Sequence, residues 1–159
     1  MPVLRLVLGD QCTRNISCLN GLEDGDTVLM AEVRAEARYV KHHKKKIAFL
    51  LSAMRHFAKD LEDEGITVTY RRYTDPENKG SLFDEVKAAV ADGDFDAVIL
   101  TECGEYRLMS DMRDWSEKLD IPVHIRPDDR FIATHDEFAE WADGRKQYRM
   151  EFFYREMRK

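Results

Sequence analysis

The chain has 159 residues, a formal net charge of −6 at pH 7, 43% hydrophobic residues and 35% charged residues. This length suits one ordinary domain with its own hydrophobic core, and the composition is that of a folded protein rather than a disordered one. No apolar run reaches the roughly 20 residues of a membrane-spanning helix, and the residues after Met1 lack the pattern of a secretion signal. We therefore expect a cytoplasmic protein without a membrane partner.

The charge and the cysteines argue against two further kinds of site. A negative net charge disfavours a domain that binds nucleic acid by itself, because phosphate binding needs a clustered positive surface. Cys12, Cys18 and Cys103 show no Cys-x-x-Cys spacing, so we predict reduced thiols and no metal site in this chain.

Five short apolar runs are typical of strands, and helical patterns lie between them. The expected strands are 3–8, 27–31, 66–70, 97–101 and 123–125, and the expected helices are 36–64, 81–90, 106–119, 136–142 and one from Arg145 onward. Apolar strands without alternation indicate burial on both faces, as in parallel sheets covered by helices. Ser81 is a candidate helix cap, and Gly65 a candidate helix end.

Strands that alternate with helices predict an α/β fold. We expect a Rossmann-like three-layer domain with a five-stranded parallel sheet in the order 3-2-1-4-5. Ligands of such sheets bind beyond the carboxyl ends of the strands, where the strand order reverses. This rule indicates the segments after the first, second and fourth strands as the site.

Polar side chains are concentrated in those three segments. Gly9, Asp10 and Gln11 follow the first strand, Glu32, Arg34 and Glu36 follow the second, and Thr101, Glu102 and Glu105 follow the fourth. Several carboxylates, with Arg34 and Arg107 to balance them, suit a polar small molecule better than a polyphosphate. The alternative is a set of ion pairs, turns and helix caps at the edge of the sheet.

Common phosphate-binding and nucleophile motifs are absent from the sequence. There is no G-x-x-x-x-G-K-[ST], no G-x-G-x-x-G after the first strand and no G-x-S-x-G. His42 and His43 are adjacent, so they point to different sides of a helix and make a poor metal pair. The basic run 41–46 around them is typical of a solvated surface, with an anionic ligand, an acidic surface or another domain as alternatives.

The last segment, 144–159, combines aromatic residues with arginines and lysines. Large aromatic side chains on a basic helix usually pack against another protein surface. We therefore interpret 1–143 as the α/β domain and 144–159 as the start of a helical linker, and we expect the protein to continue.

Five strings along the chain resemble the deoxyribodipyrimidine photolyase-related family. They are LVLGDQ (6–11), LMAEVRAEARYVKHHKKKIAFLLSAMRHFA (29–58), TECGEYR (101–107), RPDDRF (126–131) and GRKQYRMEFFYREMRK (144–159). The family includes bacterial (6-4) photolyases and cryptochromes that carry an iron–sulfur cluster. The chain resembles their N-terminal antenna-binding domain.

The resemblance implies a longer flavoprotein for light-driven DNA repair. Its N-terminal domain would hold a light-harvesting chromophore, typically 6,7-dimethyl-8-ribityllumazine. A helical C-terminal domain, absent from this chain, would bind FAD, a [4Fe–4S] cluster and damaged DNA. The antenna passes excitation to the flavin, so the resemblance implies no catalytic residue in this chain.

The resemblance also implies a set of cofactor-binding residues. They are Gly9, Asp10, Gln11, Glu32, Arg34, Glu36 and Tyr39, with Ile47 and Leu51 as an apolar wall, and Thr101, Glu102 and Glu105 as a third group. Cys103 replaces the proline of the family pattern Thr-Glu-Pro-Gly-Glu, so this loop is expected to be freer. Three alternatives stay open: a cryptochrome-type photoreceptor, a stand-alone nucleotide-binding or receiver-like module, and an interaction domain with an empty crevice.

Overall fold

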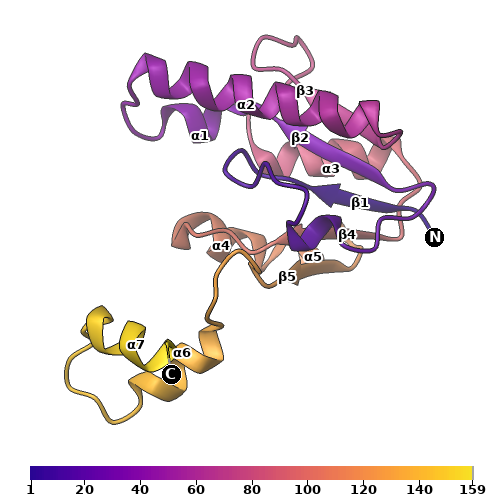
Figure 1. The fold of residues 1–159 in the computed structure, drawn as a ribbon. Helices are drawn as coiled ribbons and strands as arrows, with labels where there is room; N and C mark the ends of the chain where they lie inside the picture. Colours follow the sequence, from indigo (N-terminus) through magenta and orange to yellow (C-terminus); the bar gives the residue numbers. More distant parts are fainter. Residues whose placement is uncertain (159) are drawn as a thin grey trace. The chain divides into compact units, whose positions relative to one another are not determined.

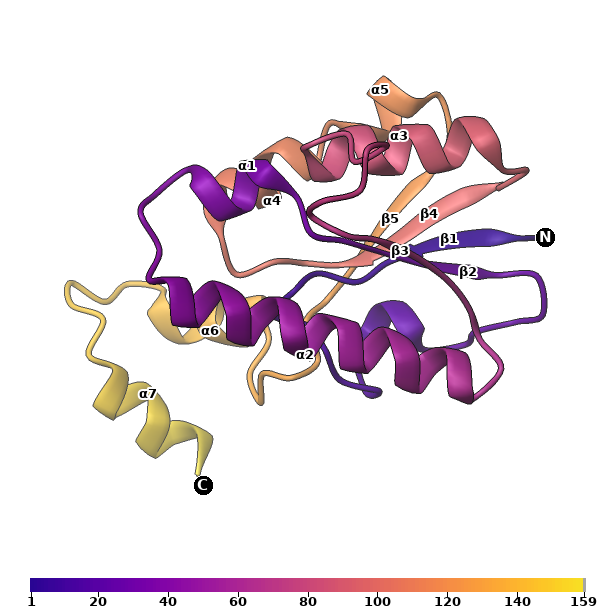
Figure 2. The same ribbon diagram turned by 90° about the horizontal axis from the view of Figure 1, so that it is seen from above.

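The computed structural model describes residues 1–158, and it contains a parallel sheet with helices on both faces (Figures 1 and 2). The strands are β1 (Val3–Leu6), β2 (Thr27–Ala31), β3 (Thr67–Arg71), β4 (Ala97–Thr101) and β5 (Val123–Arg126). Their order is β3-β2-β1-β4-β5 and every neighbouring pair is parallel. The predicted fold class and strand order are confirmed.

Seven α-helices and one 3₁₀ turn connect or follow these strands in the described residues. They are η1 (Ser17–Leu19), α1 (Arg34–Arg38), α2 (Lys44–Asp63), α3 (Leu82–Asp92), α4 (Tyr106–Met112), α5 (Trp115–Leu119), α6 (His135–Ala142) and α7 (Met150–Met157). Ser81 caps α3 as expected, with its hydroxyl oxygen accepting from Asp84 N at 3.1 Å. Gly65 follows α2 with a φ of +84°, a conformation that glycine adopts at little cost.

The hydrophobic core lies in two layers, one on each face of the sheet, and Figure 2 shows the helices that cover these faces. On one face α2 and η1 cover the sheet, and Met54 and Leu61 of α2 are buried there against Val28. On the other face lie α3, α4 and α5, with Trp115 fully buried. Burial on both faces explains the continuous apolar character of the strands.

Three helix predictions were wrong in their extent. The expected helix 36–64 is two helices, because the chain leaves helical geometry between Arg38 and Lys44 and His43 caps α2 by accepting from Lys45 N. The expected helix 106–119 is α4 followed by α5, with a turn that buries the indole of Trp115. The last helix begins at Met150 rather than near Arg145, because a loop is needed before α7 can pack on α6.

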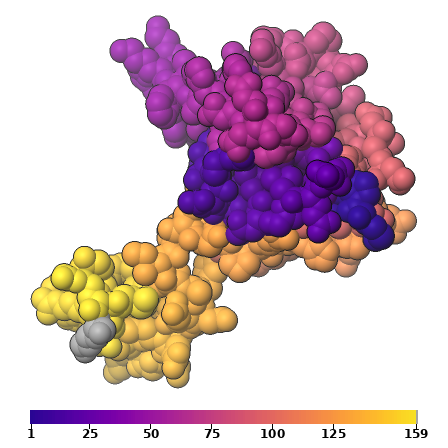
Figure 3. All heavy atoms as spheres, turned by 45° about the vertical axis from the view of Figure 1, so that its right-hand side comes forward, coloured from indigo at the N-terminus to yellow at the C-terminus, as the bar shows by residue number. Residues whose placement is uncertain are grey.

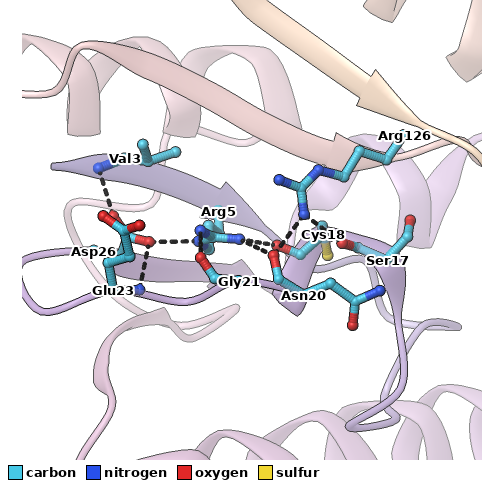
Figure 4. A network of polar contacts seen from close by, with 9 residues as sticks. All are labelled: Val3, Arg5, Ser17, Cys18, Asn20, Gly21, Glu23, Asp26 and Arg126. Carbon is cyan, nitrogen blue, oxygen red and sulfur yellow. Dashed lines mark hydrogen bonds and ion pairs between the residues drawn. The ribbon is translucent and has the colours of Figure 1, made fainter. Parts of the chain in front are cut away.

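The connection from β1 to β2 is fixed by two arginines, Arg5 and Arg126 (Figure 4). Buried Arg5 donates to Asp26 Oδ2 at 2.7 Å and to the backbone oxygens of Cys18, Asn20 and Gly21 at 2.7, 3.0 and 2.6 Å. Arg126 of β5 donates to the oxygens of Ser17 and Asn20 at 2.8 and 2.7 Å. Figure 3 shows the atoms of this N-terminal region, in indigo, lying beside α2 and the β5 segment. The two guanidinium groups therefore supply donors to the backbone oxygens of Ser17, Cys18, Asn20 and Gly21 in this connection.

The chain divides into two compact units, Met1–Asp128 and the residues from Asp129 on. In the second unit α6 packs on α7 through Phe138, Trp141 and Phe153, with the Phe138 and Trp141 ring centroids 5.2 and 5.1 Å from that of Phe153. Helix α6 thus belongs with α7, and the interpretation of 144–159 as the start of a linker stays a prediction. Within residues 1–158, no helix combines the length and apolar character needed to cross a bilayer.

Candidate functional site

A cavity of about 430 Å³ opens at the carboxyl ends of β1, β2 and β4. Its apolar lining consists of Leu8, Ala31, Val33, Ala37, Ile47, Leu50, Leu51, Met54, Leu82 and Leu108. Its polar lining consists of Asp10, Glu32, Glu36, Tyr39, His42, Lys46, Cys103 and Glu105, together with Gly9 and Gly104. Volume and composition are those of a small-molecule site, and the position is the one that strand order predicts.

One wall of the cavity is a face of α2. Ile47, Leu50, Leu51 and Met54 recur at the helical spacing of three and four residues, so their side chains line the same face. Gly9 passes close to this wall, since a Cβ atom at Gly9 would lie 3.0 Å from Met54 Sδ and 3.6 Å from Leu50 Cδ2. A larger residue at Gly9 would therefore press on α2 or fill the cavity.

Glu32 supports the wall rather than offering free acceptors. Its Oε1 accepts from Arg55 Nε at 2.6 Å and from the Tyr70 hydroxyl at 2.7 Å. Its Oε2 accepts from Arg55 Nη2 at 2.9 Å and from Tyr73 N at 2.8 Å. Burial alone would raise the pKa of Glu32, but the hydrogen bonds from Arg55, Tyr70 and Tyr73 N outweigh it and lower this pKa. Glu32 is therefore a lining residue whose two carboxylate oxygens are already hydrogen-bonded within the protein.

Gln11 and Thr101 connect the loops that end at the cavity. The fully buried Gln11 side chain donates to the oxygens of Thr101 and Glu102 at 3.3 and 3.1 Å and accepts from Leu8 N at 3.3 Å. The Thr101 hydroxyl lies 2.8 Å from Ser17 Oγ. These contacts fasten the end of β4 to the segment before η1 and to η1 itself.

A bridge of charged side chains crosses the rim of the cavity. Arg107 donates from Nη2 to Glu36 Oε2 at 2.8 Å and from Nε to Glu105 Oε1 at 2.9 Å. The same guanidinium lies 4.8 Å from the ring centroid of Tyr39. Glu36 and Tyr39 belong to the α1 side of the rim, whereas Glu105 belongs to the β4 side, so Arg107 joins the two sides.

The thiols of Cys12 and Cys103, near the site, both have raised pKa values. Burial, with a smaller effect from the charge of Asp10, raises the pKa of Cys12 to about 11. Burial also raises the pKa of Cys103, which lines the cavity. Across residues 1–158, no three His, Cys, Asp or Glu side chains are grouped to hold a metal ion.

A family model described as deoxyribodipyrimidine photo-lyase-related protein matches residues 5–159. The chain belongs to this family. A (6-4) photolyase of Agrobacterium fabrum (strain C58 / ATCC 33970) is 49% identical to it over 160 residues, which cover 100% of this chain and 32% of that protein. The chain thus spans about a third of the length of this photolyase-related relative.

In this photolyase-related chain, most of the predicted cofactor-binding residues line one cavity. Those that do are Gly9, Asp10, Glu32, Glu36, Tyr39, Ile47, Leu51 and Glu105. The others lie outside the lining: Gln11, Thr101 and Glu102 in the supporting contacts, and Arg34 with its guanidinium 6.0 Å from the Tyr73 ring centroid. Direct binding by either group stays a prediction.

Sequence reasoning missed part of the lining. Leu50 and Met54 could have been found from the α2 periodicity, which already includes Leu51. His42 and Lys46 lie within the basic run, for which an anionic ligand was one alternative. Leu82 and Leu108 carry no signal, because α3 and α4 reach the cavity only through the fold.

Proposed function

We propose that this domain binds a flat antenna chromophore of the 6,7-dimethyl-8-ribityllumazine class. The observation that carries the proposal is the cavity of about 430 Å³ at the strand ends, with an apolar wall from α2 and a polar rim. A flat heteroaromatic ring with hydrogen-bonding edges and a hydroxylated chain needs this combination of surfaces.

The residues present fit such a ligand. Leu50, Leu51 and Met54 offer an apolar surface for a ring system, and Asp10 and Lys46 offer an acceptor and a donor. When bound, the chromophore would supply light absorption and transfer of excitation. The side chains would fix its position and exclude water, and we assign none of them a catalytic role.

We further propose that the complete protein is a cytoplasmic flavoprotein that repairs damaged DNA with light. Its FAD, its [4Fe–4S] cluster and its DNA-binding surface would belong to a C-terminal helical domain outside this chain. Support comes from the family and from the relative, whose name is that of a (6-4) photolyase and of which this chain spans about a third. That relative is the reason to prefer repair over a cryptochrome-type light sensor.

Titration of the purified chain with 6,7-dimethyl-8-ribityllumazine, followed by absorbance and fluorescence, tests the binding proposal. We expect saturable binding with a spectral shift, and a loss of about tenfold or more in affinity in Asp10→Ala, from loss of one charged acceptor. Asp94→Ala, which removes an exposed carboxylate after α3, is the matched control and should bind like the parent. Absence of saturable binding by folded protein, or equal affinity in Asp10→Ala, would contradict the proposal.

A further inference from the structure

The α1 side of the cavity rim is weakly anchored. Residues 34–43, here called the rim segment, contain α1, and α1 buries no side chain. Among the described residues, its ties to the β3–α3 side are one backbone bond, from Ala35 N to Gly80 O at 2.9 Å, and the stacking of Arg34 and Arg38 on Tyr73. A segment with so little buried surface opens at a low free-energy cost.

Arg107 supplies the tie on the opposite side. Its guanidinium reaches Glu36, 71 residues earlier in the chain, at 2.8 Å while it also holds Glu105 at 2.9 Å. It lies over the Tyr39 ring as well, 4.8 Å from the centroid. Glu36, Tyr39 and Glu105 line the cavity but Arg107 does not, so Arg107 acts from outside on three groups of the rim.

We propose that Arg107 is a positioning residue that closes the cavity mouth and sets the rate at which a ligand enters and leaves. A rigid fork of donors can hold two carboxylates at once, which a lysine ammonium does less well. The single positive charge of Arg107 offsets one of the two rim carboxylate charges, so it weakens the attraction of the rim for a cationic ligand. The ligand part of this inference rests on the proposed function, whereas closure of the mouth does not.

Closure can be measured without any ligand through Cys103. This thiol lines the cavity and its Sγ donates to Glu105 O at 3.4 Å, whereas Cys12 lies outside the lining and Cys18 is buried. Alkylation of the chain with iodoacetamide, read by mass spectrometry, gives the Cys103 rate relative to the internal reference Cys12.

We expect Arg107→Ala to raise the ratio of the Cys103 to the Cys12 alkylation rate roughly tenfold. The change removes two exposed ion pairs and one stacked cation, which together hold the mouth closed. Loss of a positive charge alone would disfavour the thiolate and slow the reaction, so an acceleration reports opening. Arg107→Lys should be intermediate. Arg113→Ala, the matched control, removes an exposed guanidinium at the end of α4 and should leave the ratio unchanged.

The salt dependence of this ratio distinguishes closure of the mouth by Arg107 from a general loosening of the fold. Screening weakens exposed ion pairs, so raising salt from 0.05 to 1 M, which shortens the Debye length to about 3 Å, should raise the ratio in the parent chain but not in Arg107→Ala. An unchanged ratio in Arg107→Ala, or equal salt dependence in both proteins, would overturn the proposal.

Lumazine dissociation then tests retention, with about tenfold faster release expected from Arg107→Ala. If lumazine does not bind but the Cys103 ratio responds as described, the proposed ligand is wrong and closure stands. If lumazine binds and neither the ratio nor its release changes, closure is wrong and the proposed ligand stands.

Discussion

Replacement of Arg5 by methionine removes the centre of the network in Figure 4. Arg5 and Asp26 form an ion pair with side chains that are 3% and 2% exposed. Methionine is apolar and unbranched like the aliphatic stem of arginine, so the change keeps that stem and removes the guanidinium with its hydrogen bonds. It leaves Asp26 buried with the backbone N–H groups of Val3 and Glu23 as its remaining donors.

Removing one partner of a buried ion pair costs about 3–5 kcal/mol, because the other charge stays buried without compensation. That is a large part of the roughly 5–15 kcal/mol that stabilises a typical domain. Arg5→Met combined with Asp26→Asn should cost less than the sum of the two single changes, by about 1–3 kcal/mol, since the uncompensated charge is gone.

Urea unfolding followed by far-ultraviolet circular dichroism measures these differences, with Arg113→Met as an exposed control expected to stay within about 0.5 kcal/mol. Burial raises the pKa of Asp26, but hydrogen bonds from Glu23 N, Arg5 and Val3 N outweigh it, so this pKa lies below 3.8. The stability that the carboxylate contributes is therefore present above pH 3.8 and lost as the pH falls through the lower, folded-state pKa. The cost of Arg5→Met should shrink over that acidic range. A cost of less than about 1 kcal/mol at neutral pH would refute the reasoning.

Three further predictions concern single residues. Asp120 has a φ of 56°, a left-handed conformation that glycine adopts at lower cost than aspartate. Asp120→Gly should therefore raise the free energy of unfolding by about 0.5–1 kcal/mol. A lower free energy of unfolding, measured by urea titration, would contradict this. Ser81→Ala removes the cap of α3 and should lower the free energy of unfolding by about 1 kcal/mol. An unchanged melting temperature would contradict this. Trp115→Ala empties a fully buried site and should cost about 3–5 kcal/mol, whereas Trp115→Phe should cost clearly less in the same denaturant assay.

The strands could be predicted because local apolar runs mark them, and the alternation of strands with helices favours a doubly wound parallel sheet with the observed order. The break between α1 and α2 could not be predicted in the same way. Residues 39–43 contain neither glycine nor proline, and only the folded chain shows His43 capping α2. The division of 106–119 into two helices likewise depends on burial of Trp115, a tertiary effect.

The position of the candidate site could be predicted from the strand order, but the direction of each side chain could not. Asp10 and Gln11 are neighbours, yet Asp10 lines the cavity while Gln11 turns inward to Thr101 and Glu102. The local turn decides between these two directions. The contact between Arg107 and Glu36 could not be predicted from the sequence either. The two residues are 71 positions apart and come together only in the folded chain.

The central place of β1 has a consequence for synthesis on the ribosome. β1 leaves the ribosome first, and it pairs with β2 on one edge and with β4 on the other, with Val3 opposite Ala97. Its second edge therefore stays open until β4 has emerged, and pairing between residues so distant in sequence forms slowly. During that interval the apolar Leu4 and Leu6, fully buried in the finished sheet, belong to an unpaired strand edge that is prone to aggregation. A pause in translation before β4 has emerged from the ribosome would lengthen that exposure, whereas a pause after β4 has emerged would not.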